Sequence, residues 1–210
     1  MHTDLIFLVG AGGHAKVVLD ALLENGTPLS HVCVRDEASH LQGVEFMGCV
    51  IKTPALTNEM AGSSFHLAIG KAEARRRLFT VLTALGALPL TVTHPSASIS
   101  RYASLGAGCF IGAKSVIAPG AILGQSVILN HGAIVDHDCE VGDFSHIAPN
   151  ATLGGGVRIG ANVLIGAGAN ILSGIAIGAG AVVGAGAVVT TNIGAGETRV
   201  GIPARKIIGS

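Results

Sequence analysis

The feature that most constrains this chain is a six-residue period that runs from about residue 97 to residue 194. Stepping by six from Ile99, we find Ile, Leu or Val at sixteen consecutive steps: Ile99, Leu105, Ile111, Ile117, Leu123, Leu129, Val135, Val141, Ile147, Leu153, Ile159, Ile165, Ile171, Ile177, Val183 and Val189. An α-helix would repeat near 3.6 residues, and a lipid-facing span would not need an aliphatic residue at every sixth position. The period therefore predicts a stack of short strands, in which each unit forms a strand and a corner and buries its aliphatic residue in a narrow core.

The other positions of the repeat support the same fold. The residue after the aliphatic one is usually Gly, and the residue four places after it is small or aliphatic. We expect this glycine to relieve crowding at the bend. Three units form one coil, so the sixteen units give a little over five coils. Because the repeat has no insertion, no long loop can cover a pocket, and any cleft must involve a neighbouring chain.

Charged residues are distributed unevenly, which indicates two domains. Most of them lie in residues 1–94, and between Arg101 and Glu197 only six occur: Lys114, Asp136, Asp138, Glu140, Asp143 and Arg158. The sequence thus predicts an N-terminal domain over 1–94 and a C-terminal domain over 95–210. The uncharged stretch 159–191 contains G-x-x-x-G spacings typical of membrane helices. Since the hexad continues through it, we expect no membrane span there.

Composition also bears on partners and location. The formal net charge is zero and the basic residues form no extended patch, which argues against a nucleic-acid partner. The four cysteines form no C-x-x-C pair, as is typical of a reducing compartment. We therefore expect a cytoplasmic protein.

A polar cluster interrupts the otherwise bland repeat. Five residues, Asp136, His137, Asp138, Glu140 and Asp143, occur within eight positions, and Asn130, His131 and His146 flank them. His137 is the candidate general base, because adjacent carboxylates raise the basicity of an imidazole and orient its ring. The alternative is that His137 is an ordinary solvated corner residue.

The coil of three units predicts which residues lie near His137. Gly155 lies one coil after His137 and would leave open space beside the imidazole. His146 lies half a coil away, so we expect it on another wall, where a neighbouring subunit could complete the cleft. For His131 we favour an ordinary surface residue.

A zinc site is the competing hypothesis for these histidines, because the solenoid also resembles that of γ-class carbonic anhydrases. The sequence lacks closely paired ligands, and no cysteine stands near the histidines in a chelating pattern. We therefore expect no metal.

The N-terminal segment reads as strand, glycine turn and helix. A buried strand is predicted at 5–9, a turn at 10–13 and a helix that ends near Gly26, with Asp36 after a second strand at 31–34. Further strands are predicted at 65–69 and 90–93, with a helix over 71–85 between them. Four strands are too few for a dinucleotide fold, which favours an α/β, Rossmann-like mononucleotide half-site whose helix N-terminus accepts phosphate.

Several motifs in order resemble the sugar O- and N-acyltransferases of the NeuD and PglD type. They are Gly10-Ala11-Gly12-Gly13-His14-Ala15-Lys16-Val17-Val18, Ala68-Ile69-Gly70, His94-Pro95-Ser96-Ala97, Asn130, Val135-Asp136-His137-Asp138-Cys139, Phe144-Ser145-His146-Ile147-Ala148-Pro149 and Gly201-Ile202-Pro203-Ala204. The resemblance implies a left-handed parallel β-helix, a homotrimer with active sites between subunits, and acetyl-CoA as co-substrate.

The resemblance also implies roles for individual residues. His137 matches the base and Asp138 its supporting acid; His146, Gly155, Ala167 and Ala185 match acetyl-CoA contacts; Gly12, Gly13, His14, Asp36, Gly70 and Asn130 match positions that bind the nucleotide-linked amino sugar. The chain departs from the family at Arg35-Asp36, where two acids are frequent, and at His131, where a small polar residue is more usual. The nucleobase and the sugar pocket could therefore differ.

The function expected from these observations is N-acetylation of a nucleotide-linked amino sugar, of the 4-amino-dideoxy kind, in bacterial glycan biosynthesis. Two alternatives stay open. One is O-acetylation of a sugar hydroxyl, as on a sialic acid, and the other is a nucleotide-sugar-binding protein without catalysis. The nucleotide, whether UDP, GDP or dTDP, does not follow from the sequence.

Overall fold

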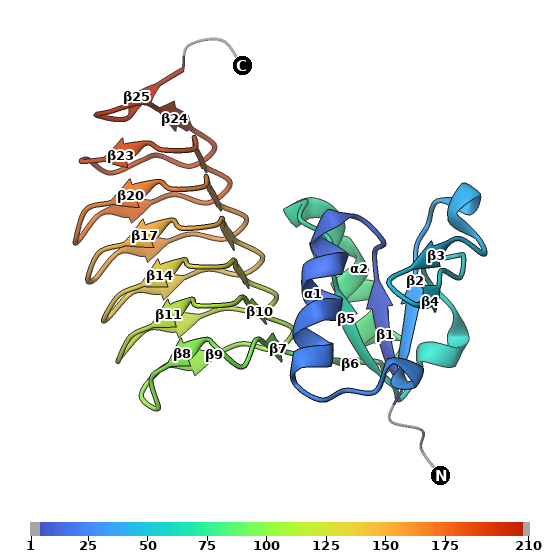
Figure 1. The fold of residues 1–210 in the computed structure, drawn as a ribbon. Helices are drawn as coiled ribbons and strands as arrows, with labels where there is room; N and C mark the ends of the chain where they lie inside the picture. The colour runs from blue at the N-terminus through green and yellow to red at the C-terminus, as the bar shows by residue number, and fades with distance from the viewer. Residues whose placement is uncertain (1–4, 208–210) are drawn as a thin grey trace. The chain divides into compact units, whose positions relative to one another are not determined.

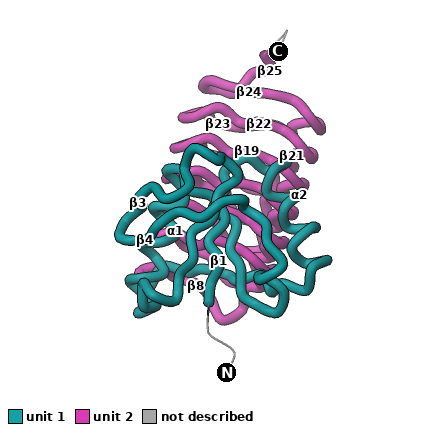
Figure 2. Tube along the Cα trace, turned by 90° about the vertical axis from the view of Figure 1, so that its right-hand side faces the viewer, with its two compact units in different colours: residues 1–95 teal, residues 96–210 magenta. Residues whose placement is uncertain are grey.

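The computed structural model describes residues 5–207. The chain divides into two compact units, Met1–Pro95 and Ser96–Ser210, which Figure 2 draws in different colours. Among the described residues, no helix is long and apolar enough to cross a membrane. The uncharged stretch 159–191 forms short strands of the second unit.

The first unit is an α/β domain (Figure 1). Its elements are β1 (Ile6–Val9), α1 (Gly13–Glu24), η1 (Leu29–His31), β2 (Val32–Arg35), η2 (Ser39–Leu41), β3 (Glu45–Phe46), β4 (Cys49–Val50), η3 (Asn58–Met60), β5 (Ser64–Leu67), α2 (Ala72–Ala84), β6 (Leu88–Pro89) and β7 (Val92–Thr93). The main sheet has the order β2-β1-β5-β6, and its neighbouring strands are parallel. The chain leaves β1 towards β2 and later returns to β5 on the other side of β1. The loops after β1 and β5 therefore diverge at the carboxyl ends of the strands, which creates a topological switch point.

The predicted elements of this unit are confirmed with small changes. Helix α1 buries the apolar face expected from its spacing, which includes Ala15, Val18 and Leu22. The strand expected at 90–93 is displaced: the fourth strand of the main sheet is β6 at Leu88–Pro89, and β7 at Val92–Thr93 does not belong to that sheet. Pro89 in β6 has no N–H to donate, which limits pairing at this edge of the sheet.

The second unit is a parallel β-helix. Its coils comprise β8 (Ser98–Ile99), β9 (Ser104–Leu105), β10 (Phe110–Ile111), β11 (Val116–Ile117), β12 (Ile122–Leu123), β13 (Ile128–Leu129), β14 (Ile134–Val135), β15 (Glu140–Val141), β16 (His146–Ile147), β17 (Thr152–Leu153), β18 (Arg158–Ile159), β19 (Leu164–Ile165), β20 (Asn170–Ile171), β21 (Ala176–Ile177), β22 (Val182–Val183) and β23 (Val188–Val189). Each aliphatic residue of the predicted period is the second residue of one of these strands. Figure 1 shows the strands stacked coil upon coil.

Three faces result, which we name by their strands. Of the sixteen strands just given, the first face holds β8, β11, β14, β17, β20 and β23, the second β9, β12, β15, β18 and β21, and the third β10, β13, β16, β19 and β22. Each strand pairs with the strand three units further along the chain, as Ile134 does with Thr152. The predicted coil of three units is confirmed.

The glycines that follow the aliphatic residues of the repeat let neighbouring coils stack closely. A Cβ built on Gly142 would lie 2.5 Å from the carbonyl carbon of Gly160 in the next coil. The bend lies two residues further along, at a position with positive φ that is usually Gly but is Asp138, Phe144 or Asn150 in the middle coils. The expectation that the glycine after the aliphatic residue relieves crowding is confirmed, but the crowding comes from the backbone of the neighbouring coil and not from the bend itself.

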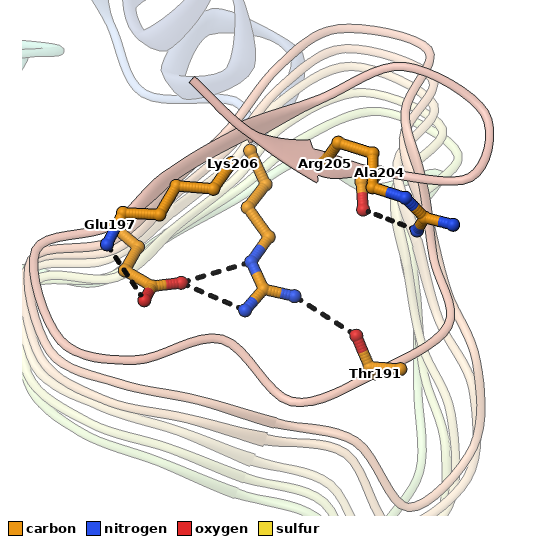
Figure 3. Close-up of polar contacts among 6 residues, drawn as sticks. Thr191, Glu197, Ala204, Arg205 and Lys206 are labelled. Atoms are coloured by element: carbon orange, nitrogen blue, oxygen red, sulfur yellow. Dashed lines mark hydrogen bonds and ion pairs between the residues drawn. The ribbon is translucent and has the colours of Figure 1, made fainter. Parts of the chain in front are cut away.

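A polar network closes the last coil, through β24 (Thr198–Val200) and β25 (Arg205–Lys206) (Figure 3). Glu197 accepts hydrogen bonds from Arg199 at 2.9 and 3.0 Å and from Lys206 at 3.3 Å. Arg199 also donates to the hydroxyl of Thr191 at 3.0 Å. These contacts tie the antiparallel end strands to the final coil, as the terminal unit of a solenoid requires.

Candidate active site

His137 and Asp138 lie at the corner between β14 and β15. Asp138 has φ of 58°, a left-handed conformation that Asp tolerates better than most residues. Its Oδ2 lies 2.8 Å from Nδ1 of His137, and Oδ1 of Asp136 accepts the backbone N–H of His137 at 2.8 Å. Both side chains of the pair are largely exposed, at 62% and 74%. The imidazole of His137 is thus oriented by hydrogen bonds and exposed to solvent.

The contacts of His137 determine its protonation chemistry. A carboxylate only accepts hydrogen bonds, so Nδ1 carries the proton and Nε2 of the neutral ring keeps a free lone pair. The hydrogen bond to Asp138, and secondarily the charge of Asp136, raises the pKa of His137 above its ordinary value. The arrangement suits a general base that acts through Nε2.

Glycines in the adjacent coils make room for this pair. A Cβ on Gly155 would lie 2.5 Å from Nε2 of His137, so the ring rests directly against this glycine. On the coil before, a Cβ on Gly120 would lie 2.5 Å from Oδ1 of Asp138. The sequence pointed to Gly155, whereas Gly120 was missed, although a step of one coil back from Asp138 leads to it.

His146 and Asn130 lie together on the third face, away from His137. His146 opens β16, and its Nε2 lies 3.3 Å from Nδ2 of Asn130. An amide nitrogen only donates, so Nε2 of His146 accepts this bond. Asn130 is buried, and its Oδ1 accepts the N–H of His131 at 2.9 Å. Asn130 therefore orients the ring of His146.

The residues predicted to bind acetyl-CoA separate into two groups within one chain. Gly155 lies beside His137, at the corner that leads from the first face to the second. Ala167 and Ala185 lie one coil apart at the corner between the third face and the first, where Gly186 N–H donates to Ala167 at 2.8 Å. His131 stands at that same corner. A single chain does not bring the two groups together.

In the first unit, the predicted substrate positions lie at the switch point. Gly12 caps α1, and Gly13 and His14 are the first residues of that helix. A Cβ built on Gly12, Gly13 or Gly70 would meet no atom within 4 Å. Backbone is thus exposed at the start of α1 and before α2, where helix N-termini favour an anion.

Asp36 shapes the glycine loop. Its Oδ2 accepts the N–H of Ala11 at 2.8 Å, and its Oδ1 accepts the N–H of Ala38 at 2.9 Å. Arg35, by contrast, is buried, and its Nε donates to the carbonyl of Pro54 at 3.0 Å. Arg35 therefore supports the 52–54 segment, and the two acids at this edge of the sheet are Asp36 and Glu37.

A small cavity of about 80 Å³ opens at this edge. Its lining includes Gly10, Asp36, Glu37, Ile69 and Arg77. Within residues 5–207, the side chains of Glu37 and Arg77 make no hydrogen bond or ion pair, so both remain available to a ligand. A larger hollow of about 360 Å³, which includes Phe7, Cys33 and Cys49 in its lining, shares no residue with the predicted site.

The described part of the chain holds no group of three or more His, Cys, Asp or Glu side chains arranged for a metal ion. His137 and His146 belong to different faces of the β-helix, and His66 lies on β5 of the other unit.

Family models match both units. The PglD N-terminal domain matches residues 5–82, the hexapeptide repeat of succinyl-transferase matches residues 102–137, and the bacterial transferase hexapeptide model of six repeats matches residues 156–191. No curated protein sequence matches the chain.

Solved structures match the chain over nearly its whole length. A histidine-to-alanine variant of GDP-perosamine N-acetyltransferase from Caulobacter crescentus, in complex with CoA and GDP-perosamine, is 31% identical, with a TM-score of 0.91 over 98% of this chain and 97% of that one. The acetyltransferase domain of PglB from Neisseria gonorrhoeae, in complex with acetyl coenzyme A, is 34% identical, with a TM-score of 0.88 over 98% of this chain and 100% of that one. WeeI from Acinetobacter baumannii is 26% identical, with a TM-score of 0.63 over 97% of this chain and 99% of that one. The chain belongs to the PglD-type family of acetyl-CoA-dependent sugar N-acetyltransferases, with a PglD N-terminal domain followed by hexapeptide repeats.

Proposed function

We propose that the protein transfers the acetyl group of acetyl-CoA to the amino group of a nucleotide-linked amino sugar, of the 4-amino-dideoxy kind, in the cytoplasmic steps of bacterial glycan biosynthesis. The observation that carries the proposal is the imidazole of His137, whose Nδ1 is bound by Asp138 at 2.8 Å while Nε2 stays open beside Gly155. An amine acceptor needs such a base, because the attacking nitrogen must lose a proton.

The proposed reaction is a direct transfer. The amine nitrogen attacks the thioester carbon while Nε2 of His137 takes its proton, and Asp138 stabilises the imidazolium. The C–S bond then breaks, and the CoA thiolate recovers the proton from His137. A backbone N–H at Gly155 is our candidate donor to the developing oxyanion. Atoms and charge balance without a covalent enzyme intermediate.

The nucleotide is proposed to bind at the switch point of the first unit. Gly12, Gly13 and Gly70 offer bare backbone there, and His14 opens α1 beside them. Asp36 holds the loop in shape, while Glu37 and Arg77 are free to contact the nucleoside. The 31% identical relative carries GDP-perosamine, which favours a nucleoside diphosphate as the recognised group.

We further propose a homotrimer in which neighbouring subunits complete each active site. The pantetheine arm of acetyl-CoA would lie along the corner of Ala167 and Ala185, near His146, where small side chains expose the backbone. Since His137 lies on a different corner of the same chain, its partner groups would come from the adjacent subunit. Asn130 would then hold His146 towards the substrates.

Replacement of His137 by Ala tests the assignment of the base. We expect kcat to fall by about 10²- to 10⁴-fold, the usual contribution of a general base. The Kd of acetyl-CoA should stay within about twofold, because binding does not need proton transfer. CoA release measures the first quantity and calorimetry the second. Unchanged turnover would remove His137 from the mechanism.

A panel of acceptors separates the proposal from its alternatives. CoA release should require a nucleotide-linked amino sugar, and mass spectrometry should find the acetyl group on nitrogen. Transfer only to the hydroxyl of a sugar without an amine would identify an O-acetyltransferase. Binding of nucleotide sugars without any CoA release, at all nucleobases tested, would identify a binding protein.

A further inference from the structure

Arg75 is a buried cation in the first unit, on the apolar face of α2. It is 1% exposed and shares this face with Leu78, Phe79 and Leu82. Its neighbour Arg76 is exposed. Burial of a guanidinium is unfavourable unless hydrogen bonds compensate it. The bonds that Arg75 makes therefore indicate why a cation stands at this position.

The guanidinium of Arg75 holds the loop between β5 and α2. Its Nη1 donates to the carbonyl of Ile69 and to the carbonyl of Gly70, both at 2.9 Å. These are consecutive carbonyls, and one charged group fixes the orientation of both peptide planes. Bonds to a charged donor are stronger than neutral ones.

This loop forms one wall of the switch point. Across from it, a Cβ on Gly10 would lie 2.9 Å from the carbonyl oxygen of Ala68 and 3.1 Å from Cγ1 of Ile69. The two loops therefore pack against each other without space for a side chain. A shift of the 68–70 loop would alter both the small cavity lined by Gly10 and Ile69 and the exposed backbone of Gly70.

The charge of Arg75 also acts on its surroundings. His66 on β5 is buried, and its pKa is lowered to about 4, mainly by loss of water and also by the positive charge of Arg75. Nδ1 of His66 lies 2.9 Å from the carbonyl of Leu90. His66 is therefore neutral near pH 7, whereas the guanidinium of Arg75 stays charged.

We propose that Arg75 is a positioning residue for the nucleotide: it fixes the 69–70 loop so that Gly70 faces the diphosphate, and its buried charge favours that anion. This inference rests on the proposed function. Arg75 acts through the loop and does not itself touch the nucleotide.

Substitution of Arg75 in the full-length protein tests the role. In Arg75→Met we expect the KM of the nucleotide sugar, and the Kd of the free nucleoside diphosphate, to rise about tenfold or more, as for loss of charged hydrogen bonds. The kcat and the KM of acetyl-CoA should stay within about twofold, because the β-helix is untouched. Arg75→Lys keeps the charge and should recover part of the affinity. Arg76→Met, at the exposed neighbour, is the matched control and should behave as wild type.

Circular dichroism shows whether each variant folds, and Arg75→Lys carries the test if Arg75→Met does not. Unchanged nucleotide affinity in a folded variant would overturn the inference. A fall in kcat together with an equal rise in the KM of both substrates would also overturn the inference, because it would assign Arg75 a general structural role. If wild type binds neither UDP, GDP nor dTDP, the proposed nucleotide site itself fails, an outcome distinct from a failure of Arg75.

Discussion

At the scale of single residues, the candidate base depends on one side-chain contact. The hydrogen bond from Nδ1 of His137 to Asp138 selects the tautomer and raises the pKa of the ring. Asp138 can make this bond because the corner places it in a left-handed conformation, with Gly120 beneath its carboxylate. The corner geometry of the repeat and the chemistry of the base are therefore connected.

Removal of the charge of Asp138 should change the pH profile. A general base acts only when unprotonated, and Asp138 raises the pKa of His137. In Asp138→Asn that pKa falls, so the acid limb of kcat/KM should move to lower pH. The kcat should fall about ten- to a hundredfold, because the imidazolium loses a charged hydrogen bond. Asp143→Asn, at a different corner, is the control. If the acid limb of kcat/KM stays at the same pH in Asp138→Asn, Asp138 does not tune the pKa of the base.

At the scale of elements, β5 carries a buried histidine in the centre of the sheet. His66 is 1% exposed, and burial is the main reason that its pKa is lowered to about 4. The unfolded chain has the ordinary pKa of 6.5. Between these values the unfolded state binds a proton that the folded state does not, so acid favours unfolding.

The stability of the first unit should therefore depend on pH through His66. The contribution of His66 to the free energy of unfolding is fully present above pH 6.5 and declines as pH falls towards 4. Between pH 7 and pH 5 we expect it to fall by about 2 kcal/mol. Urea unfolding followed by circular dichroism at the two pH values measures this difference. His66→Leu should remove most of the dependence, whereas His40→Gln at an exposed position should not. Identical pH dependence in wild type and His66→Leu would refute the prediction.

At the scale of the whole molecule, one chain separates groups that the proposed reaction needs together. His137 follows β14 on the first face, and His146 opens β16 on the third. The repeat keeps them apart because its coils carry no insertion that could bring one corner to another. In an assembly of several copies, His137 of one subunit could lie close to His146 of another.

Mixed assemblies test this arrangement. Separately, His137→Ala and His146→Ala chains should each have little activity. Co-expressed, they should regain a substantial fraction of wild-type activity, because some interfaces then join an intact His137 to an intact His146. Sizing should give a trimer. Full activity of a monomer at high dilution, or no recovery in mixed assemblies, would contradict the shared site.

The sequence by itself determined the β-helix, its register and the neighbourhood of His137. Because every coil comprises three repeat units of equal length, the step from His137 to Gly155 follows from counting. The strand, glycine turn and helix of the first unit were predictable for a similar reason, since their signals are local. Two features of that unit differ: the fourth strand of the main sheet lies at 88–89 and not at 90–93, and the antiparallel pair β3 and β4 was not predicted.

Only the tertiary structure decided what the charged residues of the first unit contact. Arg35 binds Pro54, Asp36 binds the amide of Ala11, and Arg75 binds the carbonyl of Gly70. Arg75 does lie at helical spacing from Leu78 and Leu82, which indicates burial but no partner. These partners come from loops whose paths depend on the packing of the whole sheet, and no period relates them. A regular repeat places its neighbours by arithmetic, whereas irregular loops place theirs only after the fold is complete.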